Sequence, residues 1–180
     1  MERSPGEDRR PLSRFLLPVL AAAAGLAAGW FAWPEADASR QAAAIESAAA
    51  EFRVDPALVR AIVLAESGGR PGVTSGAGAV GLMQLLPETA GELGPKIGIP
   101  DPDLTDPETN VRIGTCHLAR LLASFEGEVP LAVAAYNAGE RRVREWAESA
   151  PNLSAIEVVD ALAYDETRHY VHRVLAFQAR

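Results

Sequence analysis

Apolar residues recur at helical spacing along most of the chain beyond residue 38, and glycine- and proline-rich stretches interrupt the pattern. The spacing predicts helices over 39–52, 56–67, 82–93, 107–125, 129–136, 141–150 and about 157–178. Asp55-Pro56 and Asp106-Pro107 each place an acidic cap directly before a proline, which is typical of a helix start. No segment alternates apolar and polar residues between turn signals as a half-buried strand does. The pattern therefore predicts an all-α domain.

The segment before residue 39 has a different pattern. Residues 15–33 carry no charge, and at about 1.5 Å per residue a helix of this length crosses most of a bilayer core. Three arginines, Arg9, Arg10 and Arg14, precede the run, as in an export signal whose amino end stays in the cytoplasm. Ala36-Asp37-Ala38 has the small-x-small form of a signal-peptidase site. Residues 1–38 are thus either a cleaved signal peptide or a signal anchor in the inner membrane, and residues 39–180 are expected on the periplasmic side of the cell envelope.

Length and charge narrow the classes of function. The 180 residues leave room for one modest domain after residue 38. A net charge of -7 provides no general attraction for DNA or RNA, so nucleic acid is not an expected partner. The one cysteine, Cys116, cannot form an internal disulfide or a thiolate metal cluster and is interpreted as a small buried apolar residue.

Glu66 is the first candidate for chemistry. It follows a helix that is almost wholly apolar, and it lies seven, four and three residues after Val59, Ile62 and Val63, so it continues the apolar stripe. It also occupies the last turn, where the helix dipole opposes a negative charge. Both effects favour the protonated carboxyl and raise its pKa, which is the property that a general acid needs near neutral pH.

Three other patterns point to different chemistry and are weaker. Gly76–Gly81 satisfies GxGxxG, but no strand precedes it and no parallel-sheet pattern follows, so a dinucleotide site is not expected. Glu166, His169 and His172 have the spacing of metal ligands on a helix but lack a partner helix, so no metal is predicted. A Ser-His-Asp hydrolase built from Ser67, His169 and Asp165 has no GxSxG elbow.

Several motifs, in order, resemble those of the soluble-lytic-transglycosylase-type (SLT) domain, a relative of goose-type lysozyme. The first half of the pattern is Glu66-Ser67, Ser75, Gly76-Ala77-Gly78-Ala79-Val80-Gly81-Leu82-Met83-Gln84 and Pro87-Glu88-Thr89-Ala90. The second half is Asp106-Pro107 with Asn110 and Gly114, then Ala134-Ala135-Tyr136-Asn137-Ala138-Gly139, then Glu166-Thr167-Arg168 with Tyr170-Val171. The match covers roughly residues 40–178.

The resemblance implies a lysozyme-like, mainly helical domain over residues 39–180 that binds peptidoglycan glycan strands in a groove, with no cofactor. It makes Glu66 the catalytic acid. The substrate-binding residues that it implies are Ser75, Gln84, Tyr136 and Asn137, with Glu166 and Tyr170 in a second cluster nearby. The chain departs from the family at His117, where a tyrosine is common, and at Gly68–Pro71, where an aromatic is common.

The expected reaction is non-hydrolytic cleavage of the β-1,4 bond between N-acetylmuramic acid and N-acetylglucosamine, which leaves a 1,6-anhydro end. One carboxyl suffices if the C6 hydroxyl of the same sugar replaces water as the nucleophile, an intramolecular advantage. Two alternatives stay open: a hydrolytic muramidase, and an inactive glycan-binding scaffold of an envelope complex.

Overall fold

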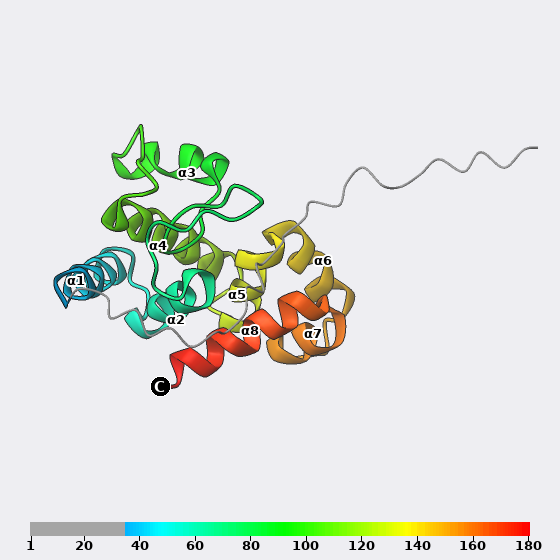
Figure 1. The fold of residues 1–180 in the computed structure, drawn as a ribbon. Coiled ribbons are helices and arrows are strands. Elements are labelled where there is room, and N and C mark those ends of the chain that lie inside the picture. Colours follow the sequence, from blue (N-terminus) through cyan, green and yellow to red (C-terminus); the bar gives the residue numbers. More distant parts are fainter. Residues whose placement is uncertain (1–34) are drawn as a thin grey trace, which may run out of the picture.

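The computed structural model describes residues 35–180, with side chains from residue 38, and within that range the fold is all-helical (Figure 1). The α-helices are α1 (Glu35–Phe52), α2 (Pro56–Ser67), α3 (Pro87–Leu93), α4 (Pro107–Ser124), α5 (Val129–Ala138), α6 (Glu140–Ser149), α7 (Ala155–Leu162) and α8 (Asp165–Gln178), with a short 3-10 helix, η1 (Pro95–Ile97). The only strand-like pairings of the described residues are two isolated bridges, Thr74 with Val80 and Val80 with Leu85. The predicted all-α class is confirmed.

Helix α5 lies at the centre of the main body. It contacts α4, α6, α7 and α8, while α2 packs on α8 and α1 packs on α4 (Figure 1). Residues 131–135 of α5 are all buried, which is why this helix is apolar on every side. A second, smaller core of Leu85, Ala90, Leu93, Leu104 and Ile113 lies beneath α3. Helix α4 contributes to both cores and so joins the α3 lobe to the main body.

Two predicted boundaries were wrong, and each has a local cause. Helix α3 begins at Pro87 rather than at residue 82, because Gly81 and Gln84 have φ of 82° and 46° and turn the chain out of the helical path. The predicted helix over 157–178 is broken at Ala163 and Tyr164, whose backbone is extended. The caps at Asp55 and Asp106 are confirmed, since their carboxylates accept hydrogen bonds from Ala57 N and Thr109 N.

The predicted membrane-crossing run, residues 15–33, lies outside the described residues, and the small-x-small sequence 36–38 falls in the first turn of α1. None of the helices described for residues 35–180 combines the length and apolarity needed to cross a bilayer.

A buried asparagine fixes the segment between α2 and α3. Asn110 is fully buried in α4; its Oδ1 accepts a hydrogen bond from Met83 N at 2.9 Å, and its Nδ2 donates to Val80 O at 2.8 Å and Leu104 O at 3.0 Å. A Cβ on Gly81 would lie 2.2 Å from that Nδ2, so only glycine permits the approach. Hereafter residues 80–85 are called the clamped segment.

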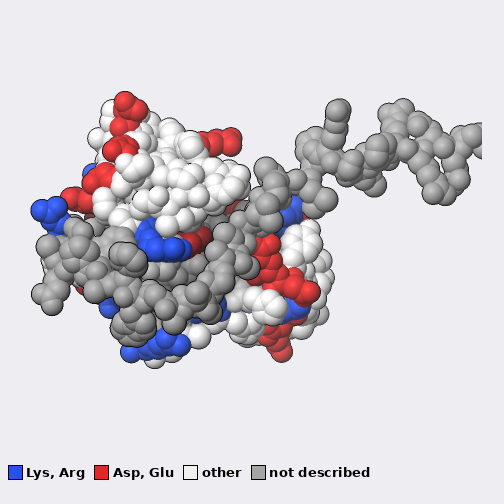
Figure 2. All heavy atoms as spheres, in the orientation of Figure 1, with Lys and Arg blue, Asp and Glu red and all other residues white. Residues whose placement is uncertain are grey.

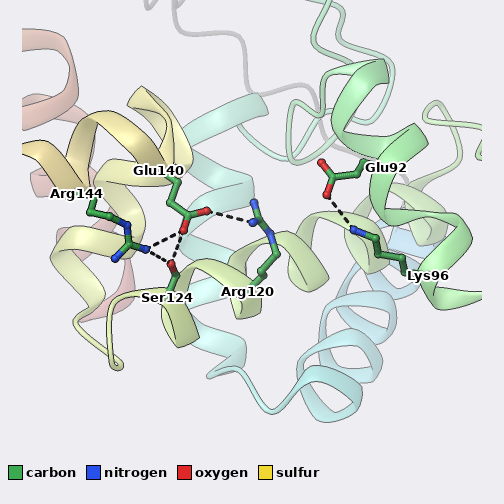
Figure 3. Close-up of polar contacts among 6 residues, drawn as sticks. All are labelled: Glu92, Lys96, Arg120, Ser124, Glu140 and Arg144. Atoms are coloured by element: carbon green, nitrogen blue, oxygen red, sulfur yellow. Dashed lines mark hydrogen bonds and ion pairs between the residues drawn. The ribbon is translucent and has the colours of Figure 1, made fainter.

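Helices α4 and α6 are joined by a polar network at the surface (Figure 3). Glu140 accepts from Arg120 at 3.1 Å and from Arg144 at 3.0 Å, and Ser124 donates to the same carboxylate. A separate pair, Lys96 with Glu92, lies between η1 and α3. The arginines and the Lys96–Glu92 pair are exposed and Glu140 is partly exposed, so we assign these contacts the small stabilisation of surface ion pairs.

Asn110→Ala tests the clamp. The variant leaves one donor and two acceptors of the buried backbone without their partners, so we expect the free energy of unfolding to fall by about 3 kcal/mol or more. Urea unfolding measures this change. The exposed Asn152→Ala is the matched control and should stay within about 0.5 kcal/mol of the parent protein; equal effects at both positions would contradict the clamp.

Candidate active site

Glu66 is carried to its position by the end of α2. The helix starts at the Asp55 cap and stops because Gly68 adopts the left-handed conformation, φ 62°, with its N–H bonded to Leu64 O. Five of the residues before Glu66 are buried apolar side chains, so the carboxyl emerges from the core rather than from a solvated face. Glu66 itself is partly exposed, which leaves one side open to a ligand.

Burial and nearby polar groups have opposite effects on the pKa of Glu66. Burial raises its pKa from 4.5 to about 7, while a hydrogen bond from Tyr170 and the positive charge of Arg173 act in the opposite direction. Within residues 35–180 no second carboxylate shifts the pKa of Glu66. The carboxyl is therefore half protonated near neutral pH, as the apolar stripe predicts.

Helix α8 supplies both of the groups that oppose burial. The buried Tyr170 donates its hydroxyl hydrogen to Glu66 Oε1 at 2.6 Å. Arg173 donates to Ala65 O at 3.2 Å and lies 5.7 Å from the centre of the Tyr170 ring. This places a cation at the C-terminal end of α2, where free carbonyl groups favour one. Residues 104 positions apart in the sequence thus form one acid site.

Tyr136 and Ser67 bond the backbone of the clamped segment and hold it near Glu66. The Tyr136 hydroxyl donates to Met83 O at 2.9 Å, and Ser67 Oγ donates to Leu82 O at 2.9 Å. Burial and the neighbouring Glu66 both raise the pKa of Tyr136 and of Tyr170 well above the usual value for tyrosine. The two phenols therefore stay protonated and lie around the Glu66 carboxyl.

The other predicted substrate-binding residues occupy different places. The Gln84 side chain donates to Val73 O and Gly81 O, at 3.0 and 2.9 Å, and thereby holds the loop before α3. Ser75 Oγ accepts from Ala79 N at 3.0 Å within the glycine-rich turn.

Asn137 Oδ1 accepts from Thr167 at 2.8 Å, which joins α5 to α8, and Glu166 is exposed in the first turn of α8. The structure thus brings Tyr136 and Tyr170 to Glu66, and shows loop or interhelix contacts for Ser75, Gln84 and Asn137.

Three residues of the site were not predicted from the sequence as site residues. Ser67 is fully enclosed, Arg173 acts on Glu66, and His117 packs on Tyr136 with ring centres 5.1 Å apart. Burial, and then the charge of Arg120, lowers the pKa of His117 to about 4, so this imidazole is neutral at physiological pH. The signal for Arg173 was its place three residues after Tyr170, on the same helical face.

Two cavities are formed by other parts of the described chain. One, of about 660 Å³, lies between α1 and the start of α4, and the other lies between α1 and α2. None of the predicted site residues lines either one. His, Cys, Asp and Glu side chains of the described residues form no group of three that could hold a metal ion. Cys116 is half-buried, and burial raises its pKa.

The chain belongs to the transglycosylase SLT domain family, whose model matches residues 43–159. It is 43% identical over 124 residues to the soluble lytic murein transglycosylase of Salmonella typhimurium, and 42% identical over 124 residues to that of Escherichia coli, covering 66% of this chain and 19% of each relative. It is also 38% identical over 105 residues to a transglycosylase of the phage PRD1, covering 58% of this chain and 37% of the relative.

Solved structures agree with the sequence matches. The 70 kDa soluble lytic transglycosylase of Escherichia coli and an inactive glutamate-to-glutamine mutant of the Pseudomonas aeruginosa lytic transglycosylase Slt each align with a TM-score of 0.72 and 37% identity. Each alignment covers 76% of this chain and 23% of the other. The chain thus spans about a fifth of the length of these larger relatives. The predicted family and the helical lytic transglycosylase fold are confirmed.

The raised pKa of Glu66 has a consequence for stability. The folded protein holds this proton more strongly than the unfolded chain, so the free energy of unfolding falls as pH rises from about 4.5 to about 7 and is flat above. Glu66→Gln removes that slope. Relative to the variant, the parent protein should lose about 3 kcal/mol between pH 4 and pH 8, at about 1.4 kcal/mol per pKa unit. Urea unfolding at both pH values checks this, and parallel pH profiles for the two proteins would contradict it.

Tyr170→Phe tests the hydrogen bond to Glu66. Removing a donor that favours the carboxylate should raise the pKa of Glu66 further. Carbon-13 NMR of the glutamate side chains measures the titration directly. The control is Tyr164→Phe, an exposed tyrosine at the start of the same helix, which should leave the Glu66 titration unchanged.

Proposed function

We propose that the protein is an exported peptidoglycan lytic transglycosylase that cleaves the β-1,4 bond between N-acetylmuramic acid and N-acetylglucosamine without consuming water. The observation that carries the proposal is the state of Glu66 in this member of the SLT family: its carboxyl is partly exposed, and burial raises its pKa to about 7. A solved relative described as an inactive glutamate-to-glutamine mutant supports a glutamate as the essential group.

Glu66 acts twice in this proposal. The protonated carboxyl first donates its proton to the glycosidic oxygen, and the bond to the muramic C1 breaks with positive charge developing on that sugar. The carboxylate then removes the proton from the muramic C6 hydroxyl, whose oxygen bonds to C1 and closes the 1,6-anhydro ring. Protonated Glu66 is restored, and the attacking group is already attached to the reacting sugar.

The surrounding residues hold the acid in both states. Tyr170 donates to the carboxylate that forms after the first proton transfer, and Arg173 provides a positive charge nearby. Tyr136 fixes Met83 O and so keeps the clamped segment beside the acid. Ser75, Gln84, Asn137 and Glu166 are proposed to line the glycan groove; for Gln84 the side-chain Oε1 is the group proposed to bind a sugar amide, since its Nε2 donates within the loop.

Residues 1–38 are proposed to carry the domain across the inner membrane, either as a cleaved signal or as an anchor, so that it meets peptidoglycan on the periplasmic side. The support is the uncharged run 15–33 behind three arginines. Expression with and without residues 1–38, followed by cell fractionation, tests this step: loss of envelope localisation is expected in the truncated protein, and unchanged localisation would contradict it.

Glu66→Gln is the decisive test of the activity. The variant keeps the size and most contacts of the side chain but carries no transferable proton, so we expect release of soluble fragments from purified sacculi to fall by at least a thousandfold. Mass spectrometry of the products made by the parent protein should show anhydromuramic ends. Products heavier by one water would indicate a hydrolytic muramidase, and binding without any soluble product would indicate a scaffold.

The pH dependence provides an independent check. Because the first step needs protonated Glu66, kcat/KM should decline as pH rises through about 7. Tyr170→Phe should move this decline to higher pH. An activity that rises steadily from pH 6 to pH 9 would contradict Glu66 as the acid.

A further inference from the structure

The first turn of α6 carries an arginine whose charge is not balanced by a carboxylate. Arg141 pairs with Glu145 at 3.0 Å, and Arg144 pairs with Glu140 at 3.0 Å. Arg142, between them, forms no ion pair with any residue of the described chain. On a helix where both neighbouring arginines are paired, this guanidinium is available to another anion.

Stacking holds that guanidinium in place. The Arg142 Cζ lies 5.2 Å from the centre of the Tyr164 ring, and Trp146 meets the same ring edge-on at 5.6 Å and 83°. A guanidinium stacked on an aromatic face keeps its N–H groups free in its own plane, where they can donate in pairs to a carboxylate. Tyr164 is 56% exposed, so this cluster of Arg142, Trp146 and Tyr164 lies at the surface. We call it the arginine platform.

Helix α8 connects the arginine platform to the acid site. Tyr164 precedes α8, six residues before Tyr170, which corresponds to about 9 Å along the helix axis. Thr167, between them, bonds Asn137 at the end of α5, and α6 begins three residues after Asn137. Figure 1 shows α6, α7 and the start of α8 together on one side of α5. A strand bound at Glu66 would meet Arg142 if it extended along α8 toward the start of that helix.

We infer that Arg142 binds a carboxylate of the peptide stem that muramic acid carries. This inference rests on the proposed function, because it takes peptidoglycan as the substrate. The sugar rings of the strand are mostly uncharged, whereas the short stem peptides end in free carboxylates. In Figure 2 the basic side chains that are in view stand in separate groups. Because Arg141 and Arg144 are already ion-paired, Arg142 offers a single guanidinium, which is suited to one local anion rather than to a polyanion.

The test compares two substrates that differ only in the stem. One is uncrosslinked glycan strands with their peptides, and the other is the same strands after an amidase has removed the peptides and the lactyl carboxyl exposed by that hydrolysis has been converted to its methylamide. Arg142→Gln should raise KM about tenfold for the stem-bearing strands with kcat unchanged, and should leave KM for the bare strands unaltered. Equal loss on both substrates, or no loss on either, would overturn the inference.

Further variants distinguish the contribution of the Tyr164 ring from that of the Arg142 charge. Tyr164→Leu should reproduce part of the stem-dependent loss because the guanidinium loses its support, whereas Tyr164→Phe should behave as the parent protein. The matched control is Arg180→Gln, which removes an arginine stacked 5.3 Å from the Phe177 ring at the other end of α8 and should change neither KM. Thermal unfolding midpoints, matched among the variants, exclude a general loss of folding.

A binding measurement keeps this inference distinct from the proposed function. Sedimentation of the Glu66→Gln protein with each strand type measures affinity without any cleavage. A preference for stem-bearing strands that disappears in the Glu66→Gln, Arg142→Gln double variant supports the inference, even if the parent protein yields no anhydro product. No such preference, together with normal anhydro products, overturns the inference and leaves the proposed function intact.

Discussion

Removal of the Glu66 carboxyl from water is the constraint on which the rest of the site depends. A carboxyl at the surface would be ionised at neutral pH, and it is burial at the end of an apolar helix that raises the pKa to about 7. Such burial carries a cost in stability, and the surrounding contacts limit it: Tyr170 offers a hydrogen bond to the charged form, and Arg173 offers a nearby positive charge. The balance between these opposing effects places the carboxyl where it can both give and accept a proton.

The clamped segment, residues 80–85, is held by side chains from three different helices. The clamped segment has little regular structure, yet α2, α4 and α5 each bond its backbone, through Ser67, Asn110 and Tyr136. Gln84 keeps a positive φ there, which is strained for a residue with a side chain, and its amide bonds to Val73 O and Gly81 O help to offset that strain. A segment whose only regular pairing is two isolated bridges is thus held in place by side chains from three helices.

The sequence was sufficient for the parts of this structure that depend on local pattern. The apolar stripe through Glu66 and the Asp-Pro caps follow from spacing alone, and the ordered motifs led to the correct family. The start of α3 was missed because Leu82, Met83 and Leu85 are buried by turns, and helical periodicity does not distinguish such buried residues from those of a helix. The hydrogen bonds of Gln84 and Asn137 and the contact of His117 with Tyr136 depend on which elements meet in space, and no local pattern encodes them.

The bond between Tyr170 and Glu66 joins the second helix to the eighth. A ribosome produces the glutamate more than a hundred residues before its phenolic partner, so a growing chain holds the acid without the helix that tunes it. The acid site is therefore completed late, when α8 docks against α2, and a chain still being synthesised holds this glutamate without the hydroxyl and the arginine that oppose its burial.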